Sequence, residues 1–222
     1  MPLRIFCVIP ALNEKNNIQD VVRGVVPCVD SVIVVDDGSQ DDTAGLAEQA
    51  GATVLRHAVN RGQGAALRTG TEYAFGQGAD IVVHFDADGQ FLTKDIAVVT
   101  GPIVDGQAAI VFGSRFLDNT TKMPLIKRRV IMPLARIINK LFLGVELTDP
   151  QSGFRAFSRD AFKRLAWQQD GMAHASEILA LSAHSGLAVK EVPITVIYHQ
   201  YGQKFSGGMK ILKDLFFGKL IR

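Results

Sequence analysis

Two carboxylates separated by one residue, Asp86 and Asp88, directly follow the apolar run from Ile81 to Phe85. In extended backbone, this spacing places both side chains on the same side of the chain. Neighbouring carboxylates repel each other unless a cation lies between them or one of them keeps its proton. Hard oxygen ligands suit Mg²⁺ or Mn²⁺, and such ions commonly share their coordination with substrate phosphates. The pair therefore predicts a metal site for a nucleotide diphosphate, although Asp and Gly are also ordinary turn residues.

Three further polar turns follow strand-like segments: Asn13-Glu14 after residues 4–9, Asp36-Asp37 after 31–35, and residues 60–64 after 53–56. Strand-like and helix-like segments alternate from residue 4 to residue 85, which predicts a largely parallel sheet with helices on its faces. Ligands of such sheets bind beyond the carboxyl ends of the strands, so we expect all four turns on one rim. The pair Gly62-x-Gly64 does not complete the G-x-G-x-x-G motif of dinucleotide-binding proteins, because Leu67 occupies the position of the third glycine.

Periodicity extends this pattern along the chain. The first helix is marked by four apolar residues on one face: Ile18, Val21, Val22 and Val25. The helix that follows Thr93 is expected to break at Gly101-Pro102. Residues 148–155 are interpreted as a polar loop that leads to a helix over 159–165, and residues 109–112 and 189–197 as strands. Further helices are expected at 44–50, 64–75, 116–145, 175–186 and 201–222.

Length and composition set broad limits. The 222 residues are 47% hydrophobic and 21% charged, which is typical of a soluble globular protein. A net charge of +2 is too small to attract nucleic acid to the molecule as a whole. Two cysteines, Cys7 and Cys28, make no disulfide framework, and no window reaches the roughly 18 apolar residues of a membrane span. We therefore expect a soluble or peripheral protein in a reducing compartment.

Basic residues gather in two segments. Residues 122–140 carry six Lys or Arg and no acid, and residues 204–222 carry five against one acid, Asp214. Both are candidates for contact with a phosphate group or a membrane surface. Solvated helix faces account for such charges equally well.

The ordered motifs resemble those of family 2 glycosyltransferases with the GT-A fold, and within them the dolichyl- or polyprenyl-phosphate sugar synthases. The resemblance covers roughly residues 4–200 and rests on these motifs: Pro10-Ala11-Leu12-Asn13-Glu14, Val34-Val35-Asp36-Asp37-Gly38-Ser39, Asn60-Arg61-Gly62-x-Gly64, Asp86-Ala87-Asp88-Gly89-Gln90, Gly113-Ser114-Arg115 and Asp149-Pro150-Gln151-Ser152-Gly153-Phe154-Arg155. It implies an α/β fold with a Rossmann-like, mostly parallel sheet and helices on both faces. We expect one GT-A catalytic domain over residues 1–222, with a nucleotide-binding half (1–115), an acceptor half (116–200) and a basic amphipathic C-terminal helix (201–222).

The resemblance also implies roles for individual residues. Metal binding, of Mg²⁺ or Mn²⁺, falls to Asp86, Asp88 and Gln90. The nucleotide is expected to contact the following residues: Pro10, Leu12, Glu14, Val35, Asp37, Asn60, Arg61, Gly64, Asp86 and Ala87. These motifs are common to users of UDP- and GDP-sugars, so they predict a nucleotide-sugar without choosing its base.

The implied reaction is an inverting transfer of a sugar, mannose or glucose, to a polyprenyl or dolichyl phosphate at the cytoplasmic membrane face. A lipid phosphate is already ionised near neutral pH, so it requires cations to position it and no general base. The candidate cations are Arg115, Arg128, Arg129 and Lys204. The segment 198–208 departs from the family pattern, because it lacks the arginine and the Ser-Lys pair that many such synthases carry.

Asp149 and Arg115 are the candidate catalytic residues, and two alternatives stay open. In the first, the acceptor is a saccharide hydroxyl and Asp149 is its general base; otherwise Asp149 orients Arg115 or a donor hydroxyl. In the second, the chain is a nucleotide-binding module without turnover. For the lipid acceptor, we expect peripheral attachment to the membrane through the basic helices or through a membrane-embedded partner protein.

Overall fold

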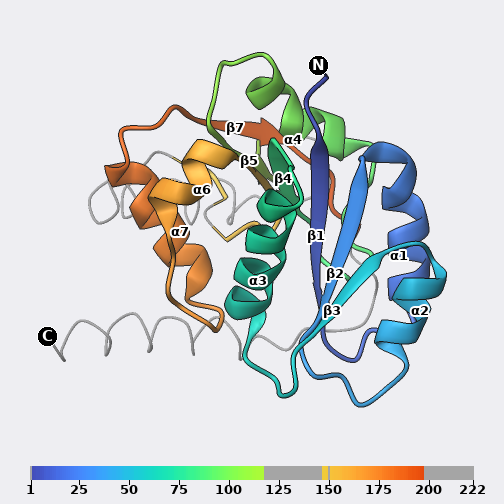
Figure 1. Ribbon diagram of the computed structural model, residues 1–222. Helices are drawn as coiled ribbons and strands as arrows, with labels where there is room; N and C mark the ends of the chain where they lie inside the picture. Colours follow the sequence, from blue (N-terminus) through green and yellow to red (C-terminus); the bar gives the residue numbers. More distant parts are fainter. Residues whose placement is uncertain (1, 118–146, 150, 198–222) are drawn as a thin grey trace, which may run out of the picture.

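The computed structural model describes residues 2–117, 147–149 and 151–197. Seven strands form one sheet in the order β3-β2-β1-β4-β6-β5-β7 (Figure 1). All neighbouring pairs are parallel except those that involve β6, which runs antiparallel between β4 and β5. The strands are β1 (Ile5–Ala11), β2 (Ser31–Asp36), β3 (Thr53–Arg56), β4 (Ile81–His84), β5 (Ile110–Ser114), β6 (Arg155–Ser158) and β7 (Val189–Pro193).

Helices cover both faces of this sheet, as the apolar contacts show. Helices α1 (Ile18–Val25), α2 (Thr43–Gln49) and α4 (Asp95–Val104) pack on one face, together with the inward side chains Ile9, Val34 and Val83. Helices α3 (Gln63–Gly76), α6 (Arg159–Leu165) and α7 (His174–His184) pack on the other, against Val8, Val35 and Phe157. The short 3-10 helix η1 (Val26–Cys28) follows α1. The predicted architecture, a mostly parallel sheet between two helical layers, is confirmed.

The four polar turns do reach one rim. β1 pairs with β2 through Ala11 but with β4 only as far as Val8, so the end of β1 projects beyond β4. Pro10 therefore lies inside β1, although a strand end was expected there, and its missing N–H faces the side on which β4 has already ended. The turn after β1 is tied to the turn after β2, because Asn13 N–H donates to Ser39 Oγ and Gln40 N–H donates to Asn13 Oδ1.

Three sequence-based boundaries were wrong. Residues 155–158 form β6, where no strand was expected between the loop 148–155 and the helix from 159. Arg155 and Ser158 frame only two apolar residues, which is too short a pattern to indicate a strand. Helix α4 continues through Pro102 to Val104. Proline there removes the helical hydrogen bond to the carbonyl of Val98, a residue that is exposed. β7 ends at Pro193, four residues before the expected Ile197.

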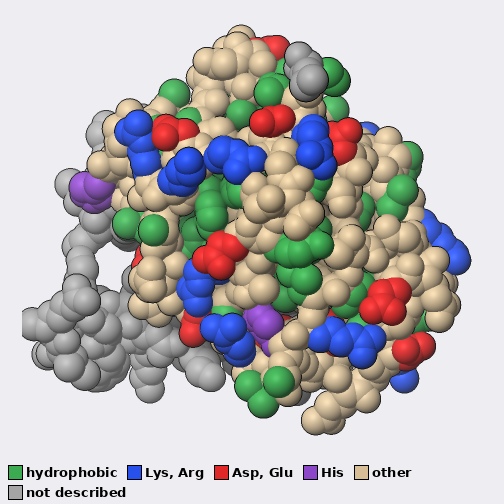
Figure 2. Space-filling view, viewed as in Figure 1, with side chains coloured by type: hydrophobic (Ala, Val, Ile, Leu, Met, Phe, Trp, Pro, Cys, Tyr) green, Lys and Arg blue, Asp and Glu red, His purple; other side chains and the backbone are tan. Residues whose placement is uncertain are grey.

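The remaining described helices and strands match the predictions within three residues, and β3 and α6 match fully. The helices expected over 116–145 and 201–222 lie outside the described residues, together with most of both basic segments. Within the ranges that the structure describes, no helix has the length and apolarity needed to cross a membrane. On the face seen in Figure 2, Lys and Arg side chains lie next to Asp and Glu side chains and form no uniform basic patch.

Helix α3 packs unusually close to the sheet at Gly70. A methyl group built on Gly70 would lie closer than 3.0 Å to side-chain carbons of Val8 and Val35. We expect Gly70→Ala to destabilise the protein by about 1–3 kcal/mol, as overpacked cores do. Gly76, at the end of the same helix, has open space around it, so Gly76→Ala is the matched control and should change stability by less than about 1 kcal/mol. Urea unfolding of both variants measures the difference; equal stabilities would contradict this packing.

Candidate active site

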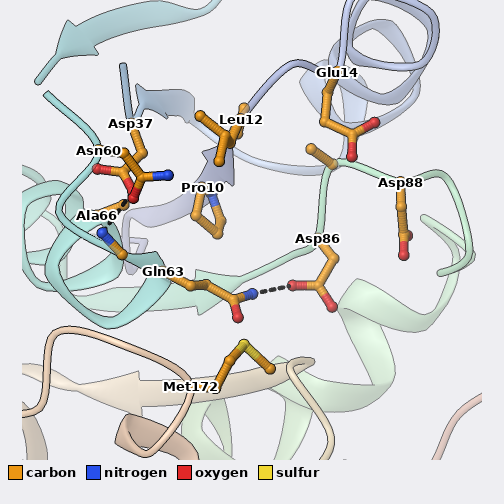
Figure 3. A pocket seen from close by; sticks show the side chains of 13 residues that line it. Pro10, Leu12, Glu14, Asp37, Asn60, Gln63, Ala66, Asp86, Asp88 and Met172 are labelled. Carbon is orange, nitrogen blue, oxygen red and sulfur yellow. Dashed lines mark hydrogen bonds between the residues drawn. The ribbon is translucent and has the colours of Figure 1, made fainter. Parts of the chain in front are cut away.

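A cleft of about 400 Å³ lies at the rim where β1, β2 and β4 end and α3 begins (Figure 3). Most of the residues predicted to bind a nucleotide or metal line it: Pro10, Leu12, Glu14, Asp37, Asn60, Asp86, Ala87 and Asp88. The lining also includes Gln63 from α3 and Met172 from the segment before α7, neither of which was predicted. The cleft is where a parallel sheet offers a ligand site.

Four predicted residues lie outside this lining. Val35 is fully buried in the core beneath α3. Gly64 is buried in the first turn of α3. Arg61 and Gln90 are close in sequence to residues that line the cleft. Their assigned contacts with nucleotide or metal stay predictions.

Asp37 organises the loop between β3 and α3 (residues 57–62, the 57–62 loop). Its carboxylate accepts the backbone N–H groups of Arg61, at 2.9 Å, and Gly62, at 2.7 Å. The same carboxylate lies 2.6 Å from Nδ1 of His57, whose Nε2 meets Thr69 Oγ1. Asp37 is therefore a buried anchor for the wall of the cleft as well as a part of its lining. His57 was missed, because a single histidine in a loop carries no pattern.

Asp86 is a buried carboxylate in an acidic setting. Its Oδ1 accepts from the side-chain amide of Gln63 at 3.2 Å (Figure 3). Gly153 leaves room for the carboxylate, since a Cβ there would lie 2.6 Å from Oδ2. Burial, and after it the neighbouring charge of Asp88, raises the pKa of Asp86 to about 6. The positive charges of Arg155 and Arg115 oppose this increase in the pKa of Asp86.

The charges of the cleft fit a divalent cation. The lining has four carboxylates, from Glu14, Asp37, Asp86 and Asp88, and among the described residues it has no Lys or Arg. A nucleoside diphosphate would be repelled by this lining unless a cation came with it. No group of three His, Cys, Asp or Glu suited to a metal occurs in the described part of the chain. Two carboxylates fit Mg²⁺ or Mn²⁺ when substrate phosphates and waters complete the shell.

Asp149 and Arg115 form a bidentate pair beside Asp86. The guanidinium Nε and Nη2 donate to the two Asp149 oxygens at 2.6 and 2.7 Å, and the backbone N–H of Arg115 adds a third bond at 3.2 Å. The Asp149 side chain is only 2% exposed, whereas that of Arg115 is 27% exposed. The carboxylate of Glu191 holds the backbone before the pair in place by accepting the N–H groups of Thr148 and Asp149. The other predicted acceptor cations, Arg128, Arg129 and Lys204, lie outside the described residues.

A second cation, Arg155, lies fully buried behind Asp86 and was not assigned a role from the sequence. Burial lowers the pKa of Arg155 to about 10, and the charge of Asp86 opposes that decrease. Burial and the charge of Arg155 lower the pKa of the adjacent His174 to about 4. His174 is therefore neutral near pH 7, and Arg155 is the positive charge on this side of Asp86. The signal in the sequence was its place at the end of the motif Asp149-Pro150-Gln151-Ser152-Gly153-Phe154-Arg155.

Comparisons with known proteins agree with this geometry. The model of the family "Glycosyl transferase family 2" matches residues 6–166. The chain is 34% identical to a UDP-N-acetylglucosamine–dolichyl-phosphate N-acetylglucosaminyltransferase of Methanococcus voltae, over 98% of this chain and 95% of the relative. It is 28% identical to a polyprenol monophosphomannose synthase of Mycolicibacterium smegmatis, over 96% of this chain and 84% of that protein.

Solved structures give the fold. Glucosyl-3-phosphoglycerate synthase from Mycobacterium tuberculosis, in complex with Mg²⁺ and uridine diphosphate, superposes with a TM-score of 0.70 at 25% identity, over 94% of this chain and 76% of that one. The fold is GT-A, as the sequence motifs implied. With the family model matching well over half of its residues, the chain belongs to glycosyl transferase family 2.

Proposed function

We propose that this chain transfers a hexose from a nucleotide-sugar to a polyprenyl or dolichyl phosphate. The proposal follows two relatives, aligned along nearly the whole chain, whose names specify dolichyl phosphate and polyprenol monophosphomannose. One observation carries the proposal. The cleft is acidic and needs a cation to accept a diphosphate, and Arg115, held by Asp149, is close enough for its charge to act on Asp86 of the cleft. Residues 1–115 then serve as the nucleotide-binding half of one catalytic domain and residues 116–200 as its acceptor half.

On the donor side, Asp86 and Asp88 hold Mg²⁺ or Mn²⁺ in this proposal. The backbone N–H of Gln90 donates to Asp88 Oδ1 at 3.0 Å and orients that carboxylate. A bound divalent ion offsets the negative charge of the departing nucleoside diphosphate. Pro10, Leu12 and Asn60 line the part of the cleft on which base and ribose rest, and the 57–62 loop forms its wall.

On the acceptor side, Arg115 positions the lipid phosphate. A guanidinium fork matches phosphate oxygens, and one edge of this fork is already fixed by Asp149. The phosphate oxygen is ionised near neutral pH and attacks the sugar carbon directly, in line with the leaving diphosphate, which inverts the configuration. No proton needs to be removed in this step.

The saccharide alternative requires Asp149 as a general base, and its contacts disfavour that role. Both carboxylate oxygens already accept from Arg115, and the side chain is 2% exposed. A general base must reach the substrate hydroxyl with one of its oxygens, and both Asp149 oxygens are held by Arg115. The geometry supports the other role considered for Asp149, the orientation of Arg115.

Asp149→Asn separates the two roles. If Asp149 orients Arg115, an asparagine keeps one acceptor oxygen, and we expect transfer to fall by only about tenfold, the effect of weakening one hydrogen bond to a charged group. Loss of a general base would cost up to about 10⁴-fold. Initial rates of lipid labelling at saturating donor decide between them, and a loss beyond about a thousandfold would restore Asp149 as the base.

We propose that the enzyme works at the cytoplasmic face of a membrane as a peripheral protein. The two basic segments, residues 122–140 and 204–222, support this proposal through their charge, which anionic lipid surfaces attract. Attachment through a membrane-embedded partner protein stays a prediction from the sequence.

A donor panel tests the proposed function. The full chain is incubated with Mg²⁺ or Mn²⁺, a polyprenyl phosphate and, in turn, labelled UDP- and GDP-sugars. Label that enters the organic phase and disappears in Asp88→Ala identifies the sugar and the lipid acceptor. Diphosphate release without labelled lipid would overturn the lipid acceptor, and absence of release with every donor would overturn the transferase activity.

A further inference from the structure

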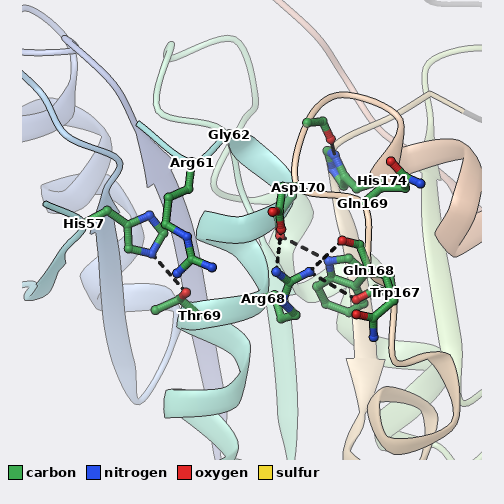
Figure 4. A network of polar contacts seen from close by, with 12 residues as sticks. His57, Arg61, Gly62, Arg68, Thr69, Trp167, Gln168, Gln169, Asp170 and His174 are labelled. Carbon is green, nitrogen blue, oxygen red and sulfur yellow. Dashed lines mark hydrogen bonds and ion pairs between the residues drawn. The ribbon is translucent and has the colours of Figure 1, made fainter. Parts of the chain in front are cut away.

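The segment Trp167–Met172, which lies about 100 residues beyond the 57–62 loop in the chain, packs directly on its end (Figure 4). The backbone N–H of Ala65, in the first turn of α3, donates to the carbonyl of Asp170 at 3.1 Å. The indole N–H of Trp167 donates to the carbonyl of Gly64 at 3.1 Å. The start of α3 is thus held by the segment Trp167–Met172 as well as by its own helix.

Two glycines of the motif Asn60-Arg61-Gly62-x-Gly64 make this packing possible. A Cβ at Gly62 would lie closer than 3.0 Å to the carbonyl oxygen of Asp170. A Cβ at Gly64 would lie closer than 3.0 Å to the carbonyl oxygen of Gln169. Both obstacles are backbone atoms, which cannot move aside as a flexible side chain can. The glycine spacing therefore serves the fit of this segment as well as any approach of a nucleotide.

Two charged side chains fix the segment Trp167–Met172 in place. Arg68, from α3, donates to the carbonyls of Trp167 and Gln168 at 3.3 and 3.2 Å and pairs with Asp170 (Figure 4). Glu177, from α7, accepts the backbone N–H groups of Gln168 and Gln169, the closer at 2.7 Å. The anchors thus come from helices that belong to different parts of the chain.

The segment ends in the cleft. Met172 is 64% exposed and lies below the hydrogen bond between Gln63 and Asp86 (Figure 3). It is an apolar side chain in a lining that mixes polar and apolar residues, and its position depends on the anchored backbone before it.

We propose that Arg68 and Glu177 are positioning residues for the donor. Through the segment Trp167–Met172, they hold the end of the 57–62 loop and place Met172 against the bound nucleotide-sugar. This inference rests on the proposed function, because it assumes that a nucleotide occupies the cleft. Neither residue lines the cleft, and the hydrogen bonds that both make to the segment Trp167–Met172 connect them to it.

The protein carries its own reporter of this coupling. Trp167 is the single tryptophan of the chain, it is fully buried, and its indole is bonded to Gly64. Titration of UDP and of GDP, each with Mg²⁺, into the full-length protein should therefore change its tryptophan fluorescence. The same titration gives the dissociation constant.

Arg68→Met and Glu177→Gln are the test variants, with Arg164→Met as the control that loses only an exposed ion pair to Asp160. We expect each test variant to raise the dissociation constant of the bound nucleotide about tenfold, the effect of losing a hydrogen bond to a charged group. The donor KM should rise in parallel while kcat changes less than twofold. Arg68→Lys, which keeps the charge but donates from a single nitrogen, should recover part of the affinity. Arg164→Met should equal the wild type.

Thermal melting of each variant shows which ones fold, and Glu177→Gln carries the test if Arg68→Met does not. Nucleotide affinity equal to that of the wild type in a folded variant would overturn the inference while leaving the proposed function intact. A fall in kcat without a rise in KM would also overturn it. Failure of the wild type to bind either nucleotide would overturn the proposed function and the inference with it.

Discussion

Replacing Asp86 with asparagine is expected to lower the rate of sugar transfer by on the order of a thousandfold. The substitution weakens the binding of the divalent ion, and the ion's stabilisation of the negative charge on the leaving diphosphate is worth several kcal/mol. Asp86 is the buried member of the carboxylate pair, and an asparagine in its place would keep the contact with Gln63 while losing the negative charge. Nucleoside diphosphate release at saturating donor measures the effect. Asp105→Asn, a change at the end of α4 outside the cleft lining, is the control.

The same substitution should stabilise the metal-free protein. The folded-state pKa of Asp86, about 6, lies above its ordinary value of 3.8, so the ionised form is the costly one. This cost is absent below pH 4, grows as the pH rises and is complete above pH 6, where it amounts to at most about 3 kcal/mol. We expect the melting temperature of Asp86→Asn to exceed that of the wild type at pH 8 in the presence of a chelator. The difference between the two melting temperatures should shrink towards pH 4. A variant that is inactive and less stable at pH 8 would show that Asp86 has a structural role instead.

Arg115→Met is expected to lower transfer to polyprenyl phosphate by about a hundredfold or more, the value of a charge-assisted bidentate contact made to the acceptor. Nucleotide affinity should change far less, since Arg115 does not line the described cleft, although its charge acts on Asp86. The kcat/KM for the lipid phosphate measures the loss, and the nucleotide dissociation constant measures the control quantity.

Arg115→Met alone leaves Asp149 buried without its guanidinium, which is destabilising by itself. The double variant Arg115→Met with Asp149→Asn removes that unpaired charge and should show the same loss of transfer with better stability. Arg115→Lys keeps a point charge without the fork and should fall between wild type and Arg115→Met. Unchanged kcat/KM for the lipid phosphate in the double variant would exclude Arg115 as its binding group.

The fold was largely predictable because its first half follows one simple rule. Apolar runs such as 31–35 and 81–85 are buried on both faces, and amphipathic helices separate them, so the parallel sheet follows from their alternation. The β6 strand escaped prediction because its four residues pair antiparallel with strands about 70 and 45 residues away, and only those partners make it a strand. Pro102 was misjudged because Val99 and Ile103, on either side of it, are buried in the core and favour continuation of the helix despite the local cost of proline.

Part of the site was predictable for the same reason. Asp37 directly follows β2, and Asp86 and Asp88 lie in the turn just after β4, so topology alone brings them to one rim. The roles of Arg155 and Met172 depend on contacts across the molecule, which a single sequence does not display. Gly62 and Gly64 were recognised as a motif, but their close contact with residues 169–170 became evident only from the packing.

The most direct test of the central claim compares two acceptors that differ only in their head group. The full chain, with Mg²⁺ and the labelled nucleotide-sugar that the donor panel identifies, is offered either a polyprenyl phosphate or the corresponding polyprenol in detergent. Because the proposed step needs an ionised phosphate and no base, label should enter the lipid phosphate and not the alcohol. Equal or preferential labelling of the polyprenol would contradict the account, since an enzyme that activates a hydroxyl must have a general base at its acceptor site.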